Sequence, residues 1–297
     1  MKPQKKAYLF ALAAIACWST IGSAFKISLG YLDPLELLFF SSFVACLILF
    51  SILLFQGKLA LLNKLSLKEV LLSAFLGFLN PFLYYVVLLK AYDILQAQEA
   101  GTLNYIWPLF LVLLSIPILG QKISLGSVIA IFISFLGIII ISIQPGITNQ
   151  SASDGVNEKL VGVLLAVGSA VFWALYWIFN VKDQREAVSK LFLNFSFGFL
   201  YTLVAIVISG EFHFPQWQGF TGAIYIGLFE MGITFVLWLY ALKFSATTAK
   251  VSNLIYLSPF ISLVIIHFAV GEPILFSTVI GLIFIVCGII MQQYLKH

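Results

Sequence analysis

The sequence predicts an all-α membrane protein of ten transmembrane helices, arranged as two inverted five-helix repeats. Hydrophobic residues make up 62% of the 297 positions and charged residues only 9%, whereas a soluble domain carries about 25% charge. Apolar runs of about 20 residues recur along the chain, the length that crosses ~30 Å of hydrocarbon. The second half also resembles the first. Residues 91–141, moved forward by 151 positions onto 242–292, match at ten positions without a gap.

Five predicted spans lie in residues 1–143 and five in residues 160–297. The first repeat has spans near 7–28, 34–55, 69–89, 95–118 and 123–143. The second has spans near 160–181, 189–209, 219–241, 246–269 and 274–294. The one long polar connection, 144–159, is predicted to be an external linker. The first run is too long and too rich in aromatic residues for a cleaved signal, so we interpret it as the first span.

Four of the ten matched positions hold residues that two unrelated membrane helices would not be expected to share. The other six are Leu, Ile or Val. The informative pairs are Tyr105/Tyr256, Pro108/Pro259, Gly120/Gly271 and Gly137/Gly288. A duplicated membrane chain whose special residues recur at equivalent depths is typical of a secondary transporter.

The positions of the basic residues predict that both termini are cytoplasmic, because cytoplasmic loops are enriched in Lys and Arg. With the N-terminus inside, twelve basic residues fall on the cytoplasmic side and three, Lys26, Lys90 and Lys159, on the outer side. Lys250 falls inside the ninth span. An odd number of spans in each half then places the second repeat upside down, and the substrate site of such a protein lies near the midplane between the halves.

The sequence offers little support for other classes of function. It has no GxxxxGK[ST], HExxH or GxSxG motif, and its three cysteines lie in three different spans. Its basic residues follow the membrane topology and form no nucleic-acid patch. We therefore predict no enzyme activity, cofactor, metal or nucleic-acid partner. The expected partners are a small-molecule substrate, the lipid bilayer and, for a coupled transporter, protons.

Glu230 is the main candidate for chemistry, because a charge in hydrocarbon costs ~2.5 kcal/mol or more unless it meets water or a partner. It lies near the centre of the eighth span and is followed by Gly232. It could bind a substrate ammonium, exchange a proton, or cap backbone groups freed at a helix break. Its repeat counterpart is position 79, next to Asn80 and Pro81. Pro81 removes a backbone donor from the third span, so both spans are expected to be broken at mid-depth.

The fourth span opens with QAQEAGTLNYIWP at 96–108, which contains Glu99, Asn104 and Pro108. Glu99 lies about one turn inside the outer end and could line an outer vestibule or reach the interface. Asn104 lies about 140° around the helix from Glu99, so the two face one site only if the helix turns at the proline. We predict that Pro81, Pro108, Gly232 and Pro259 mark helix breaks or gates.

Aromatic residues make up 16% of the chain, and those at mid-depth are informative because Trp and Tyr usually lie at the headgroups. Such rings offer apolar walls and cation–π contacts to a bound amine, or they simply pack helices together. We predict a mid-membrane cavity lined by Trp18, Asn80, Tyr84, Asn104, Trp173, Trp177, Glu230 and Tyr256, with Glu99 nearer the outside.

These features together resemble the EamA family of the drug/metabolite transporter superfamily. The resemblance rests on the repeats, the tryptophan in the first span of each, the late prolines, and the turns Gly120–Gln121 and Gly271–Glu272. QAxExGxxNYxWP at 96–108 and CWST at 17–20 resemble the YddG-type aromatic amino-acid exporters. Many family members have an Arg in the second span, where this sequence reads LLFFSSFVA. The resemblance implies an inner-membrane exporter with a cavity that opens alternately to each side.

The sequence therefore predicts a secondary transporter in the bacterial inner membrane that moves small zwitterionic metabolites, foremost amino acids with sizeable apolar side chains. Two alternatives remain open at this point. One is an exporter of lipophilic cations or polyamines, whose substrates would need no carboxylate. The other is a membrane scaffold that transports nothing and would tolerate changes at its mid-depth polar residues.

Overall fold

The computed structural model is an array of packed helices, with no strand among the residues that it describes, which are 3–120, 125–143, 152–210, 212–245 and 253–294. Seven helices are long and apolar enough to cross a membrane: Gln4–Leu29, Pro34–Phe55, Leu67–Ile94, Ala97–Ile118, Asn157–Asn180, Ala187–Ser209 and Trp217–Ala241. Three shorter apolar helices, Val128–Ile141, Leu254–Val270 and Phe276–Met291, coincide with the other predicted spans. The chain is thus an all-helical, multi-pass membrane protein.

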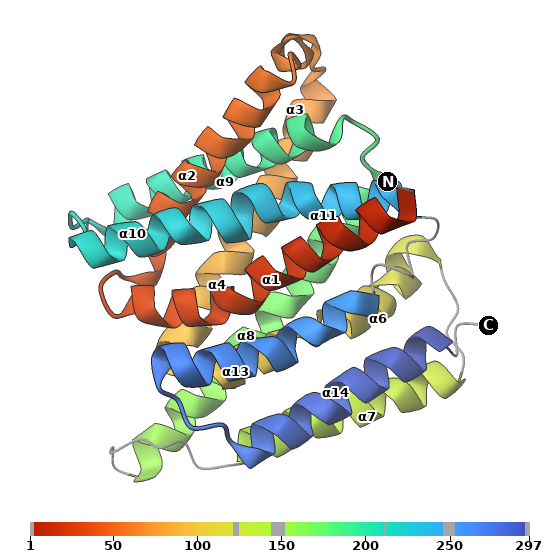
Figure 1. Ribbon diagram of the computed structural model, residues 1–297. Coiled ribbons are helices and arrows are strands. Elements are labelled where there is room, and N and C mark those ends of the chain that lie inside the picture. Colours follow the sequence, from red (N-terminus) through yellow and green to blue (C-terminus); the bar gives the residue numbers. More distant parts are fainter. Residues whose placement is uncertain (1–2, 121–124, 144–151, 211, 246–252, 295–297) are drawn as a thin grey trace.

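Among the described residues, the first half contains nine helical elements (Figure 1). They are α1 (Pro3–Leu29), α2 (Pro34–Phe55), η1 (Leu59–Lys64), α3 (Leu67–Gly77), η2 (Phe78–Leu83), α4 (Tyr84–Ile94), α5 (Ala97–Asn104), α6 (Trp107–Leu119) and α7 (Leu125–Ile143). The second half begins with α8 (Ala152–Lys182). Helix α8 begins within the stretch that the sequence predicts as the linker 144–159, of which 144–151 lie outside the described residues.

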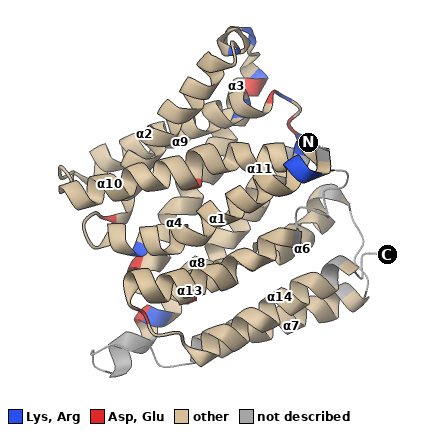
Figure 2. Cartoon of the chain, in the orientation of Figure 1, with Lys and Arg blue, Asp and Glu red and all other residues tan. Residues whose placement is uncertain are grey.

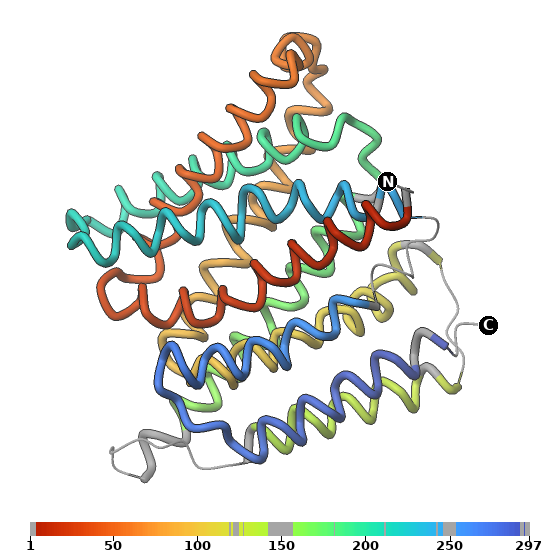
Figure 3. The backbone as a smooth tube through the Cα atoms, in the orientation of Figure 1, coloured from red at the N-terminus to blue at the C-terminus, as the bar shows by residue number. Residues whose placement is uncertain are grey.

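The second half continues in the same way. Its elements are α9 (Ala187–Ser209), α10 (Trp217–Ile226), η3 (Gly227–Gly232), α11 (Ile233–Phe244), η4 (Asn253–Leu257), α13 (Ser258–Val270) and α14 (Phe276–Tyr294). The smooth backbone trace in Figure 3 shows α14 lying along α7 at one side of the molecule, and this pair contacts α5 and α8.

Contacts between the two halves come in matched pairs. Helix α1 packs on α11 and α13, and α8, its counterpart in the second half, packs on α4 and α6. Helix α2 packs on η3, and its counterpart α9 packs on η2. Helices α2 and α9 pack on each other, as do α7 and α14. Exchanging the halves therefore leaves this set of neighbours unchanged.

The α7–α14 contact brings two backbones together at repeated glycines. A Cβ added at Gly137 would lie 2.5 Å from the carbonyl oxygen of Gly281, and one added at Gly288 would lie 2.5 Å from that of Ala130. These two contacts are interchanged by the 151-residue shift that aligns the repeats. Small residues allow such close approach between helices in a bilayer. The repeated sequence thus specifies a repeated contact.

Two long helices are interrupted at mid-length by π-helical turns. In η2, Asn80 has an extended backbone (φ −152°, ψ 120°) and Pro81 supplies no donor. In η3 the six residues Gly227–Gly232 form the turn, and the hydroxyl of Thr234 donates to the carbonyl of Phe229. The sequence predicts both interruptions, near Pro81 and near Gly232. Two other predicted breaks, at Pro108 and Pro259, lie in the first turns of α6 and α13.

Most charged residues lie at or near the ends of the helices (Figure 2). At the predicted cytoplasmic end, Arg185 binds the carboxylate of Asp183 at 2.6 Å and the carbonyl of Glu69 at 3.1 Å. Partial burial would raise the pKa of the Asp183 carboxyl, but the hydrogen bonds and charge of Arg185 outweigh it, so this pKa lies below its usual value. The loop between α8 and α9 is thereby fixed to α3.

Substitution of Gly288 by Ala should destabilise the protein by about 1–3 kcal/mol, because the added methyl group forces α7 and α14 apart. Gly168→Ala is the matched control, since a Cβ there meets nothing within 4 Å. Thermal unfolding in detergent measures both. If Gly288→Ala unfolds at the same temperature as the wild type, close approach at this glycine does not contribute to stability.

Candidate functional site

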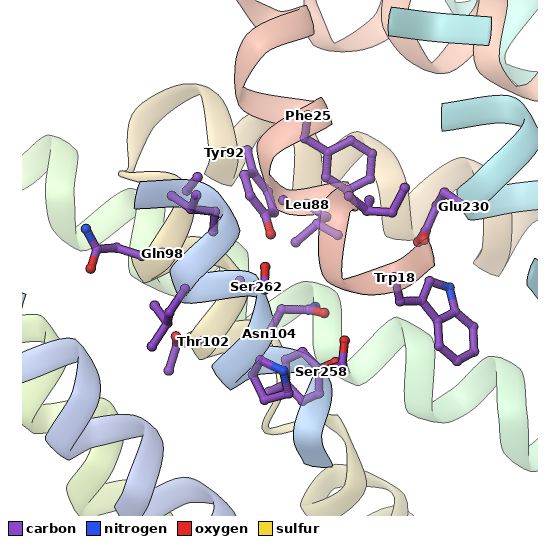
Figure 4. Close-up of a pocket in the computed structure, with 18 of the residues that line it drawn as sticks. Trp18, Phe25, Leu88, Tyr92, Gln98, Thr102, Asn104, Glu230, Ser258 and Ser262 are labelled. Atoms are coloured by element: carbon purple, nitrogen blue, oxygen red, sulfur yellow. The ribbon is translucent and has the colours of Figure 1, made fainter. Parts of the chain in front are cut away.

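A cavity of about 100 Å³ lies where helices from the two halves meet. Its walls come from α1, α4, α5 and α6 of the first half and from α8, η3, η4 and α13 of the second (Figure 4). Since a water molecule needs roughly 10–15 Å³ on the same scale, the cavity has room for a small metabolite. It is smaller than the ~300–1,000 Å³ typical of sites for drug-sized ligands.

Glu230 carries the only carboxylate that lines this cavity among the described residues, and no Lys, Arg or His lines it. The residue is 6% exposed. Its Oε1 accepts a hydrogen bond from the hydroxyl of Tyr85 at 2.8 Å, whereas its Oε2 has no described partner. One carboxylate oxygen is therefore held by Tyr85, and the other is buried without a described hydrogen-bond partner.

The position of Glu230 depends on the π-helical turn η3. Gly227, the first residue of this turn, packs so closely on α2 that an added Cβ would lie 2.6 Å from the carbonyl oxygen of Ser41. The wider turn leaves the side chain of Glu230 facing α4, where the fully buried Tyr85 reaches it. Because Tyr85 belongs to the first half and Glu230 to the second, this hydrogen bond joins the two halves.

Aromatic rings form much of the cavity wall. The rings of Tyr84 and Trp173 have centroids 4.7 Å apart, and Trp18 packs at 5.4 Å on Trp238. Trp18 and Trp173, the tryptophans of the first span in each repeat, both line the cavity. Such rings offer an apolar surface and can attract a cation within about 6 Å.

Asn104 joins the wall by two hydrogen bonds. Its Oδ1 accepts from the hydroxyl of Tyr84 at 3.2 Å, and its Nδ2 donates to Ser169 of α8 at 2.9 Å. Asn104 is the last residue of α5, and α6 begins at Trp107. The interruption between these helices leaves the amide facing the cavity.

Five of the nine substrate-binding residues predicted from the sequence line this cavity: Trp18, Tyr84, Asn104, Trp173 and Glu230. Their roles in binding stay predictions. The other four are Asn80, Glu99, Trp177 and Tyr256, and they lie elsewhere.

Each of these four has a different environment. Asn80 is fully buried in η2, and neither atom of its amide has a described partner. Trp177 packs behind Trp173, with ring centroids 5.9 Å apart. Tyr256 is buried in η4. Glu99 forms an ion pair with Lys159 at 2.9 Å, with side chains 4% and 13% exposed. Lys250, which the sequence also singles out, lies outside the described residues.

Several residues that line the cavity are not predicted from the sequence, among them Tyr92, Gln98, Ser258 and Ser262. Tyr85 is recognisable from the sequence as an aromatic residue at mid-depth, but its contact with Glu230 is not predicted. One signal was available. Tyr85 and Tyr92 are seven residues apart, which places them on one face of a helix about two turns apart. Among the described residues, no group of three His, Cys, Asp or Glu side chains could hold a metal ion.

Gln98, which lines the cavity, is joined by hydrogen bonds to the turn before α14. The carboxylate of Glu272 accepts from the backbone N–H groups of Ala97 and Gln98 at 2.8 and 3.2 Å. The side chain of Gln98 in turn donates to the carbonyl of Pro273 and accepts from the N–H of Leu275. An acidic group at a helix N-terminus is favourable, so these contacts hold α5 against the α13–α14 turn.

A family model described as the EamA-like transporter family matches residues 5–143 and 160–292, once for each half. Among curated proteins, the chain is 27% identical to an uncharacterized transporter of Clostridium kluyveri, over 97% of this chain and 93% of that one. It is 26% identical to the uncharacterized transporter YvbV of Bacillus subtilis, over 97% and 91% of the two chains. A solved crystal structure with 20% identity matches 98% of both chains with a TM-score of 0.66, so the fold is shared.

Glu99→Gln should lower the stability of the protein by about 2 kcal/mol, because it removes a charge-assisted hydrogen bond from Lys159. It should leave the affinity of the cavity for a ligand unchanged, since Glu99 does not line the cavity. Thermal unfolding with and without ligand measures both effects. Asp93→Asn is the control, because its carboxylate pairs with Lys90 at the surface, where ion pairs contribute about 0–1 kcal/mol. Loss of affinity with normal stability would instead make Glu99 a substrate ligand.

Proposed function

Because the chain belongs to the EamA-like transporter family, we propose that it is a secondary active transporter that exports amino acids or related small zwitterionic metabolites. It would act by alternating access in a bacterial inner membrane, with both termini in the cytoplasm. The observation that carries the proposal is Glu230. It lines a cavity with aromatic walls, one oxygen of its carboxylate has no described hydrogen-bond partner, and it meets no described basic side chain there.

The proposed transport cycle requires two halves that can rock against each other around a central site. Support comes from the matched contacts between the halves and from the interruptions at corresponding positions, η2 in one half and η3 in the other. Seven long and three shorter apolar helices among the described residues make ten, which is the number that two inverted five-helix repeats need.

Substrate recognition would begin with the ammonium group. Glu230 would bind it through Oε2, the oxygen without a described partner. Trp18 and Trp173 would flank the substrate with apolar and cation–π contacts, and Asn104 would hydrogen-bond to it. In the empty site a proton could occupy the same carboxylate, because an unpaired charge at this depth is costly. Exchange of a substrate ammonium for a proton is therefore a second role open to Glu230.

Export of lipophilic cations or polyamines is the alternative that one observation favours. The cavity contains an acidic group and lacks a basic one, so an amine without a carboxylate would also be bound. The two proposals differ in whether a carboxylate on the substrate raises its affinity. A scaffold that transports nothing would show no counterflow at all.

Glu230→Gln should lower transport at least roughly tenfold, equivalent to about 1.4 kcal/mol. The amide keeps the shape of the side chain and can still accept from Tyr85, but it lacks the charge that an ammonium or a proton requires. Counterflow in proteoliposomes, with amino acids, amines and sugar phosphates and with or without a pH gradient, measures the effect. Near-normal counterflow by this variant would leave Glu230 as a structural residue of the π-helical turn and would remove the proposed recognition of cations.

A cysteine introduced at Lys64 or Arg185 should react with membrane-impermeant reagents only from the cytoplasmic side, and one at Glu158 only from outside. The background would lack Cys17, Cys46 and Cys287. The reason is the excess of basic residues in the predicted cytoplasmic segments. Labelling of position 185 from outside would contradict the inverted arrangement of five and five spans.

A further inference from the structure

Two hydroxyl groups without a described hydrogen-bond partner meet in the cavity, away from Glu230. Tyr92 of α4 is 5% exposed, and both Tyr92 and Ser262 of α13 line the cavity. In Figure 4 the oxygen atoms of these two side chains point toward the same part of the pocket. A buried tyrosine hydroxyl usually has a partner, so this one is available to a ligand.

Two glycines make the room in front of these hydroxyls. A Cβ added at Gly101 of α5 would lie 2.9 Å from the Tyr92 hydroxyl oxygen. One added at Gly22 of α1 would lie 3.3 Å from that atom and 3.4 Å from the Ser262 hydroxyl oxygen. A side chain at Gly22 would thus occupy space next to both hydroxyls, and one at Gly101 would occupy space next to that of Tyr92. The space in front of the two hydroxyls is therefore bounded by the backbones of α1 and α5, and a small chemical group of a ligand could enter it.

The surrounding contacts hold Tyr92 in place. Its ring packs on Phe25, with centroids 5.2 Å apart. The ammonium of Lys26 donates to the carbonyls of Tyr92 and Leu95 at 2.8 and 2.7 Å and so binds the end of α4. The nearby carboxylate of Glu272 is already engaged by two backbone N–H groups. No acidic side chain lines this part of the cavity, and hydroxyl donors in such a place favour an acceptor on the ligand.

The spacing of Tyr85 and Tyr92 along α4 indicates where these hydroxyls lie relative to Glu230. Tyr85, which binds Glu230, precedes Tyr92 by seven residues on the same helix face, a rise of about 10 Å. The Tyr85–Glu230 hydrogen bond of 2.8 Å, the carboxylate of Glu230 and the hydrogen bonds of about 2.8 Å that a ligand would make at its two ends take up most of that rise. What remains suits a small molecule whose ammonium and carboxylate lie close together, as they do in an α-amino acid. The hydroxyl pair and Glu230 are thus positioned to bind the two ends of one small molecule.

We propose that Tyr92 and Ser262 form a second subsite that binds the carboxylate of a zwitterionic substrate while Glu230 binds its ammonium. The proposal rests on the proposed transport function and narrows its substrate class. Hydrogen bonds from hydroxyls to a carboxylate are stronger than those between neutral groups. The subsite therefore selects amino acids over amines that have the same side chain.

The test compares pairs of ligands that differ only by the carboxylate: phenylalanine with phenethylamine, and leucine with isopentylamine. Binding to the purified full chain is measured by thermal stabilisation, and transport by counterflow in proteoliposomes. The wild type should prefer each amino acid to its amine. Tyr92→Phe combined with Ser262→Ala should weaken amino-acid binding at least roughly tenfold, as expected for charge-assisted hydrogen bonds, and should leave amine binding unchanged. Glu230→Gln should weaken both.

Two matched controls separate loss of the subsite from loss of stability. Tyr201→Phe also deletes a hydroxyl, one that donates to the carbonyl of Ala74 outside the cavity, and should not alter the preference. Gly101→Ala should reproduce the effect of Tyr92→Phe because its methyl group displaces the Tyr92 hydroxyl. Gly168→Ala, where a Cβ meets nothing within 4 Å, should leave the preference for amino acids unchanged.

Equal affinity of the wild type for both members of each pair, or an equal loss of both in the Tyr92 and Ser262 variant, would overturn the proposed subsite. Absence of counterflow with the binding preference intact would overturn the transport proposal alone. A wild type that binds amines but no amino acid would overturn the subsite and favour the export of cations.

Discussion

The need to satisfy every backbone donor and acceptor within the bilayer is the constraint on which this structure depends. Two of its long helices are nevertheless interrupted at mid-length. In η3 the interruption is accommodated because Gly227 and Gly232 let the wider turn pack against α2, and because Thr234 donates to the carbonyl of Phe229. The same turn brings Glu230 out of the regular helical pattern toward α4. The departure from regular helix therefore places the carboxylate.

A carboxylate at that depth then determines what surrounds it. It needs a donor, and Tyr85 supplies one from the opposite half. The residue lines the cavity, where the neighbouring groups are aromatic rings, hydroxyls and the amide of Asn104. No basic side chain among the described residues lines this cavity, so in the proposed function a proton or the ammonium of a bound molecule would balance the charge. Glu99, by contrast, already has a cationic partner in Lys159.

The depth of a residue could be predicted from the sequence, but the direction of its side chain could not. Apolar run length locates the spans, and Glu230 is recognisable at mid-depth because charge is so rare in this chain. The environment of Glu99 depends on Lys159, which is 60 residues away, and no periodicity within one span connects the two. Trp177 lies at the predicted depth, but it packs on Trp173 and does not line the cavity. Tyr92 looks like an ordinary aromatic residue near a helix end until α1, α5 and α13 are packed around it.

Duplication explains why the two halves pack alike, and small differences between the copies explain why their ends need not behave alike. At the predicted external end, the residue after the helix-ending Gly271 is Glu272, whose carboxylate binds the first N–H groups of α5. Its repeat counterpart, after Gly120, is Gln121. A neutral amide cannot offer the charge-assisted hydrogen bonds of a carboxylate or the same attraction to a helix N-terminus. The acidic residue is thus present in one copy of the sequence only, and in the proposed transport cycle, whose two states need comparable free energies, such a difference between the copies would favour one state.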